Sequence, residues 1–261
     1  MFSSAESQLL YKVANAPILM FPSPHILVHD VFPEDFYREL RRLLPPAKAY
    51  RTLNAMGRVS SDYPETRLVL PLTPQDVAAL EEPYRSFWNA TASWLLGGSF
   101  GQILLQKFAP LLAQRFENPA AVEYGHEVLV VQDRTNYALG PHTDSVSKVL
   151  SLLFYLPVDA SRPHLGTSLY FPKDPSFTCP GGPHYEFTDF NRLMTMPYVP
   201  NTLFGFLKTA DSFHGVERVA EPDIARDLIL YDIRAVRVPG QAPAAPASSA
   251  VPAAPRTQFS F

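Results

Sequence analysis

Two histidines and one aspartate in this sequence have the residue types of a metal site. His142 and Asp144 lie in the stretch Pro-His-Thr-Asp at 141–144, and His214 follows much later in the stretch Phe-His-Gly-Val at 213–216. Two imidazoles and one carboxylate form the facial triad that holds non-haem Fe(II) and leaves coordination positions open for other ligands. The sequence therefore predicts an iron site built by His142, Asp144 and His214.

A buried strand is predicted shortly after the first two ligands. Residues 149–156 read Val-Leu-Ser-Leu-Leu-Phe-Tyr-Leu, a short apolar run of the kind that favours a buried strand. Residues two apart in a strand point to the same face of the sheet. If the backbone is already extended at His142, we expect His142 and Asp144 to face one ion while Thr143 points away.

A second histidine–carboxylate pair competes with this interpretation. His184 and Glu186 are also two residues apart, but they lie in a stretch rich in proline and glycine, without a predicted strand to direct them. Little chain separates Glu186 from His214, so few strands fit between them. We therefore favour His142 and Asp144 as the partners of His214.

The elements that must position these residues divide the chain into a helical first part and a stranded second part. We expect an extended N-terminal arm at 1–23, a helical region at 30–118 and a stranded core at 123–238. Short apolar runs separated by turn residues, as found after residue 123, are typical of a sandwich or barrel. The predicted fold class is therefore mainly β with α. The helices are expected at 36–44, 74–96 and 99–116.

Two further segments are expected to lack regular structure. Residues 172–200 are rich in proline, glycine and aromatic residues and read as a long loop, either a lid over the substrate or an insertion without function. Residues 239–261 form a Pro/Ala-rich tract that offers no periodic apolar face, and we predict a disordered tail there.

Composition limits the partners and the compartment. The chain has 261 residues and a formal net charge of −3, so no basic field favours nucleic acid or an anionic membrane. A single cysteine, Cys179, rules out a disulfide framework and suits a reducing cytoplasm. The sequence shows neither a signal-peptide pattern nor an apolar run of the roughly 20 residues that cross a bilayer. We therefore expect a cytoplasmic protein with no nucleic-acid or membrane partner.

Several motifs together resemble a known family. They are the Pro-His-Thr-Asp motif, the apolar run after it, Gly-Thr-Ser-Leu-Tyr-Phe at 166–171, Phe-His-Gly-Val-Glu-Arg-Val at 213–219, and Arg226. This set is similar to the Fe(II)/2-oxoglutarate-dependent dioxygenases, most of all the prolyl-4-hydroxylase-like branch, over residues 24–238. The resemblance implies a double-stranded β-helix, or jelly roll, with helices against one sheet. It also implies Fe(II), 2-oxoglutarate and O2, with ascorbate as a reductant.

The resemblance also implies roles for individual residues. Arg226 matches the basic residue that holds the distal carboxylate of 2-oxoglutarate, although many prolyl hydroxylases have lysine there. Arg218 is its competitor, with a substrate contact or a surface position as its other roles. Tyr155 and Gln132 are candidates for contacts with 2-oxoglutarate. The candidates for substrate contacts are Tyr137, Lys148 and Arg218.

The predicted function is hydroxylation of an unactivated C–H bond in a small molecule or an amino-acid residue, with release of succinate and CO2. Two other classes remain open from the residues alone. One is a β-barrel ligand-binding protein without redox activity. The other is a zinc-dependent hydrolase, since two histidines, a carboxylate and a water also make a catalytic zinc site.

Overall fold

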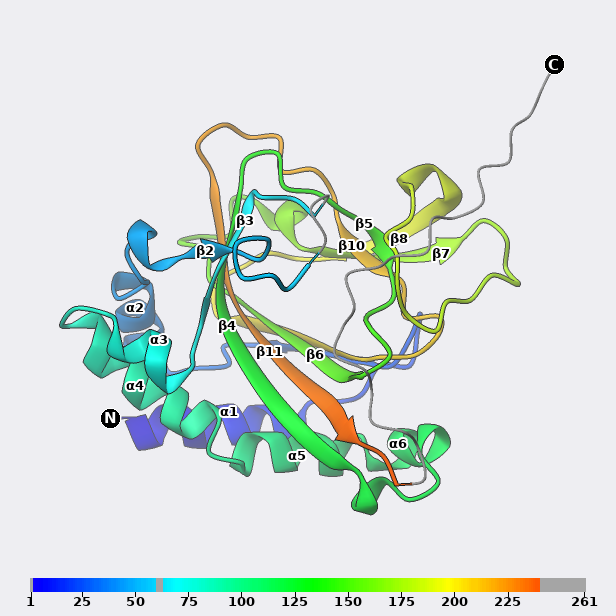
Figure 1. Cartoon of the computed structure of the whole chain (residues 1–261), viewed down its shortest axis with the longest axis horizontal. Helices are drawn as coiled ribbons and strands as arrows, with labels where there is room; N and C mark the ends of the chain where they lie inside the picture. Colours follow the sequence, from blue (N-terminus) through cyan, green and yellow to red (C-terminus); the bar gives the residue numbers. More distant parts are fainter. Residues whose placement is uncertain (1, 60–62, 240–261) are drawn as a thin grey trace.

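Two antiparallel sheets face each other, and helices cover the outer side of the larger one (Figure 1). The computed structural model describes residues 2–59 and 63–239. In spatial order, the larger sheet contains β1 (His25–His29), β9 (Thr202–Leu207), β6 (Lys148–Tyr155), β11 (Ala225–Arg237), β4 (Glu123–Arg134), β3 (Arg67–Pro71) and β2 (Arg51–Thr52). The smaller sheet contains β5 (Leu139–His142), β10 (His214–Val216), β7 (Thr167–Pro172) and β8 (Phe190–Met196).

From β4 onward the chain passes back and forth between the two sheets. Strands β4, β6, β9 and β11 belong to the larger sheet, whereas β5, β7, β8 and β10 belong to the smaller one. Every strand pairing within these two sets of four is antiparallel. This winding is a double-stranded β-helix, so the predicted fold class is confirmed.

Alternating side chains of the larger sheet supply two separate cores. On β11, Ile229, Tyr231 and Ile233 pack with the helices, whereas Leu228 packs between the two sheets. Successive side chains of a strand point to opposite faces, and both faces of β11 are covered. Both odd- and even-numbered positions of β11 are therefore apolar along this run, as expected of a strand that is buried on both faces.

The helices lie against the outer face of the larger sheet (Figure 1). They are α1 (Phe2–Asn15), α2 (Glu34–Arg42), α3 (Pro74–Ala78), α4 (Tyr84–Leu95), α5 (Ser99–Lys107) and α6 (Ala109–Arg115). The helix predicted at 74–96 is divided, because Pro83, just before α4, has no N–H to continue a helical ladder. The helix predicted at 99–116 is likewise interrupted, at Phe108, ahead of Pro110.

Two other predictions are corrected by the structure. The N-terminal arm packs on the domain as expected, but residues 2–15 are helical rather than extended. Ala5, Leu9 and Val13 recur at helical spacing and are fully buried, which is the pattern of an amphipathic helix. The segment 172–200 is not a loop throughout, because β8 lies within it and forms an edge of the smaller sheet.

Of the Pro/Ala-rich tail predicted at 239–261, only Pro239 belongs to the described residues. Among the helices described, none is long and apolar enough to span a bilayer.

Candidate metal centre

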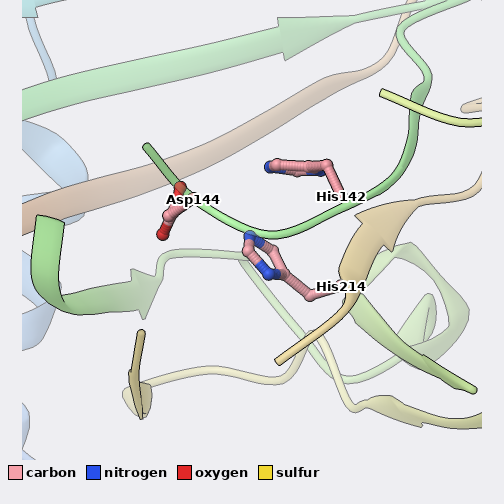
Figure 2. A group of neighbouring side chains, drawn as sticks. All are labelled: His142, Asp144 and His214. Carbon is pink, nitrogen blue, oxygen red and sulfur yellow. The ribbon is translucent and has the colours of Figure 1, made fainter. Parts of the chain in front are cut away.

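His142, Asp144 and His214 converge on one point between the two sheets. One ligand atom from each residue lies within 4.8 Å of the others, and all three residues are buried. Figure 2 shows the three side chains directed toward one another from the end of β5, the segment after it and β10. This is the only such group of three found among the described histidines, cysteines and acidic residues. The structure thus brings His142 and Asp144 together with His214, as the preferred assignment requires.

Strand pairing brings the two histidines together. His214 on β10 is the direct partner of His142 on β5, and their ring centroids are 4.3 Å apart. Close approach of these strands needs a glycine beside His214, because a Cβ on Gly215 would lie 2.6 Å from the carbonyl oxygen of Leu139. Asp144 differs from the prediction, since β5 ends at His142 and the aspartate lies in the following non-strand segment.

Backbone carbonyls fix the orientation of both imidazoles. Nδ1 of His142 lies 2.9 Å from the carbonyl oxygen of Gly140, and Nδ1 of His214 lies 3.0 Å from that of Ser212. A carbonyl can only accept a hydrogen bond, so each Nδ1 carries the proton and each Nε2 keeps its lone pair. Metal-binding histidines are oriented in this way in proteins.

The protonation states also suit a metal. Burial lowers the pKa of His142, with the neighbouring His214 and His184 adding to the effect, and burial likewise lowers the pKa of His214. Burial alone would raise the pKa of Asp144, but the charge of Lys148 and the hydrogen bond from Ser151 help to hold that pKa well below its usual range. Neutral imidazoles and an ionised carboxylate are the forms in which these residues bind metals.

Asp144 is held by two residues of β6. Ser151 Oγ donates a hydrogen bond of 2.6 Å to Asp144 Oδ2, and Lys148 Nζ lies 3.1 Å from Asp144 Oδ1. The same ammonium lies 3.0 Å from Oδ2 of Asp232 on β11. Lys148, predicted as a substrate contact, is thus engaged with two carboxylates beside the triad.

The segment between β7 and β8 packs directly on the metal-binding strand. Tyr185 N donates to the carbonyl oxygen of Pro141 at 2.9 Å, and Thr143 Oγ1 donates to that of Cys179 at 2.9 Å. The ring of His184 lies 4.5 Å from that of His142. The position of His184 beside the site could not be predicted from local sequence, because it depends on the long-range docking of the segment between β7 and β8.

Arg226 lies inside the barrel at the start of β11 and is fully buried. Its Nη1 donates to Asp133 Oδ2 at 2.6 Å, and its Nε donates to the carbonyl oxygen of Leu165. Its Nη2 makes a long contact of 3.5 Å to Thr167 Oγ1. Asp133 is also paired with Arg67, at 2.6 and 2.9 Å. Two guanidiniums thus share one carboxylate, which leaves one positive charge in excess.

Tyr155 and Tyr137 are both fully buried. The Tyr155 ring lies 5.6 Å from the Arg226 guanidinium carbon, and its hydroxyl accepts a hydrogen bond from the Thr167 backbone N–H. The guanidinium carbon of Arg67 lies 4.4 Å from the centre of the Tyr137 ring, so this candidate for a substrate contact is enclosed by the protein.

Gln132 and Arg218 point away from the triad. Gln132 follows the alternation of β4 and faces the side opposite to its neighbour Asp133, where its Nε2 donates to Asp227 Oδ1 at 2.9 Å. The predicted contact of Gln132 with 2-oxoglutarate is therefore wrong. Arg218 is exposed and donates to Asn136 Oδ1 at 2.7 and 3.2 Å, which matches the surface position that was its alternative.

Sequence reasoning missed the partners of the predicted residues. They are Ser151 and Asp232 beside Asp144, Asp133 and Arg67 beside Arg226, and His184 beside His142. For Ser151 and Asp232, the signal in the sequence was a polar residue at an inward-facing position of an otherwise apolar strand.

No protein-family model matches the sequence, and no curated protein matches it significantly. Similar solved structures include a prolyl-4-hydroxylase from Pseudomonas putida, with 15% identity and a TM-score of 0.44 over 88% of this chain and 98% of that chain. They also include a 2OG-Fe(II) oxygenase-family oxidoreductase from Burkholderia pseudomallei, with 11% identity and a TM-score of 0.45 over 80% and 85% of the two chains. The alpha-ketoglutarate-dependent carbocyclase SnoK from nogalamycin biosynthesis has 10% identity and a TM-score of 0.49 over 89% and 86%. Structural neighbours of this chain therefore include Fe(II)/2-oxoglutarate oxygenases.

Proposed function

We propose that this protein is an Fe(II)- and 2-oxoglutarate-dependent oxygenase. Its reaction would hydroxylate an unactivated C–H bond of a small molecule or an amino-acid residue and release succinate and CO2. The observation that carries the proposal is the buried group of His142, Asp144 and His214, with both Nε2 atoms left free by the carbonyl contacts. Two histidines and one carboxylate with open positions are typical of non-haem Fe(II) oxygenases.

The residues fit a bound Fe(II) ion. His142 and His214 would each offer Nε2, and Asp144 would offer a carboxylate oxygen. When bound, the iron supplies the oxidising chemistry together with 2-oxoglutarate and O2. The protein's own part is to keep the imidazoles neutral, to orient the carboxylate through Ser151, and to exclude water from the buried site.

The residues also fit the distal carboxylate of 2-oxoglutarate. The excess positive charge is shared by the fully buried Arg226 and the half-buried Arg67, and Arg226 Nη2 lies 3.5 Å from Thr167 Oγ1. Thr167 lies two residues along β7 from Leu169, the strand partner of His214. At about 3.3 Å per residue, Thr167 is therefore about 7 Å along the sheet from His214. A dicarboxylate of five carbons has the reach to join two sites with this separation.

The proposal is tested by anaerobic titration of the full chain with Fe(II) and 2-oxoglutarate. We expect a weak visible charge-transfer band that His142→Ala abolishes, and succinate release once O2 is admitted. Zinc supporting hydrolysis of a test ester, with no band from iron, would favour a hydrolase instead. If iron and 2-oxoglutarate change neither the spectrum nor the thermal stability, the proposed function is wrong.

A further inference from the structure

Both carboxylate oxygens of Asp144 are engaged by side chains of this chain. Ser151 Oγ lies 2.6 Å from Oδ2, and Lys148 Nζ lies 3.1 Å from Oδ1. A metal ion that takes one oxygen must therefore share Asp144 with a hydroxyl or with an ammonium. The two neighbours differ in charge, so they should have different effects on a dication.

Lys148 is tied to a second carboxylate. Its ammonium lies 3.0 Å from Asp232 Oδ2, and the side chains of Lys148 and Asp232 are 13% and 3% exposed. Asp232 is the strand partner of Ser151, so neighbouring strands of the larger sheet hold this group together. Asp232 Oδ1 is buried and has no hydrogen-bond partner among the described residues. Asp232 therefore has an acceptor to spare for an ammonium that moves away from Asp144.

The order of charges sets the sign of the effect on a metal. Lys148 contacts Asp144 directly, whereas the contacts of Asp232 Oδ2 among the described residues are with Lys148 at 3.0 Å and Arg234 at 3.5 Å. Coulomb energy falls with distance, and screening is weak for buried charges. A dication at Asp144 would therefore be repelled by Lys148 more than it is attracted by Asp232. Ser151 carries no charge and only orients the carboxylate.

We propose that the buried Lys148–Asp232 pair is a built-in counter-charge for the metal ligand Asp144. Without metal, Lys148 compensates the buried carboxylate and keeps it in position. With metal, the ammonium opposes the dication and turns toward Asp232, so the pair weakens metal binding. Ser151 acts in the opposite direction and strengthens metal binding by fixing the carboxylate. Lys148 and Ser151 are thus positioning residues with opposite effects, and the inference rests on the proposed metal site.

The test measures the Kd of the full chain for Ni(II) and Mn(II) by calorimetry, together with the melting temperature without metal. Lys148→Met/Asp232→Asn removes the ammonium together with its second carboxylate and leaves Asp144 its hydrogen bond from Ser151, so it should tighten binding about tenfold. Ser151→Ala should weaken binding about tenfold. Lys148→Arg keeps the charge and should stay close to the wild type. The matched control is Lys48→Met/Glu81→Gln, an exposed pair at 2.8 Å, which should change nothing.

The results separate this inference from the proposed function. A double variant that folds but binds metal as the wild type does, or more weakly, would overturn the counter-charge, as would equal effects of the two positioning residues. If the double variant does not fold, Asp232→Asn is the deciding variant. Asp144 would then be the remaining carboxylate partner of Lys148, so the affinity for Ni(II) and Mn(II) should fall. An unchanged affinity would refute the counter-charge. A wild-type chain that binds neither ion would instead refute the metal site itself.

Discussion

Replacing Arg226 with glutamine should separate 2-oxoglutarate binding from folding. The guanidinium is fully buried, but its partner Asp133 keeps two hydrogen bonds from Arg67, at 2.6 and 2.9 Å. Arg226→Gln therefore leaves no unpaired carboxylate in the interior. We expect the loss of one buried charged contact to lower the free energy of unfolding by about 1–3 kcal/mol.

Arg226→Gln should also weaken the binding of 2-oxoglutarate. A hydrogen bond to a charged group contributes about 1.5–3 kcal/mol, and each 1.4 kcal/mol is about a tenfold change in Kd. If Arg226 Nη2 binds the distal carboxylate, its loss should raise the Kd of 2-oxoglutarate about 10- to 150-fold. The Kd of 2-oxobutanoate, which lacks the distal carboxylate, should not change.

Anaerobic calorimetry of the Ni(II)-loaded chain with each oxo acid measures both values. Arg218→Gln is the matched control, because Arg218 lies eight residues before Arg226 in the chain but is exposed and donates its hydrogen bonds to Asn136. Equal loss of affinity for both oxo acids would show that Arg226 acts through the fold. Loss of 2-oxoglutarate binding in Arg218→Gln, with Arg226→Gln unaffected, would move the anchor to the competitor.

Three further substitutions test the surroundings of the site. Asp133→Asn leaves two buried guanidiniums without a counter-ion and should lower the free energy of unfolding by about 3–5 kcal/mol in a denaturant titration; a loss below that of Arg226→Gln would contradict this. A Cβ on Gly140 would lie 2.2 Å from the carbonyl oxygen of Tyr185. Gly140→Ala should therefore displace the segment before β8 and speed tryptic cleavage after Lys173. An unchanged cleavage rate would refute the docking of this segment on β5. Burial lowers the pKa of His126 from its ordinary 6.5, so the unfolded chain takes up the proton first and stability falls as the pH falls below about 6.5. Between pH 7.5 and 5.5, the free energy of unfolding of His126→Gln should fall less steeply than that of the wild type, by a difference of less than about 1.4 kcal/mol per pH unit. Equal slopes for the two proteins would refute this prediction.

The triad could be predicted because its chemistry restricts the residue types and β strands restrict their direction. The prediction that His142 and Asp144 share one strand was wrong. Strand β5 ends at His142, and the segment after it directs the Asp144 carboxylate toward Ser151 of β6. Local alternation cannot reveal that turn, since it depends on Ser151 and Lys148 receiving the side chain. The ligand set was thus readable from the sequence, while the contacts that orient it were not.

The remaining errors have similar physical causes. Helix α1 was missed although Ala5, Leu9 and Val13 carry its period, because the polar residues between them and the later prolines dominate the composition of that stretch. Strand β8 was missed because residues 191–194 are all exposed, so the edge strand shows no alternation of polar and apolar residues. Its existence depends on pairing with β7, which is a tertiary contact.

The interior of the barrel holds two groups of charged residues. Near the triad, Asp144 and Asp232 both contact Lys148, and Arg234 Nη2 lies 3.5 Å from Asp232 Oδ2. Around Arg226, two guanidiniums share Asp133, which leaves one positive charge in excess. A dication at the first group would add positive charge beside Lys148, and the oxo-acid carboxylate of 2-oxoglutarate would offset it, while the distal carboxylate would neutralise the excess charge of the second group. Since buried charges are costly unless paired, the metal and the dicarboxylate supply charges of opposite sign that favour each other's binding. We therefore expect each to increase the affinity of the chain for the other.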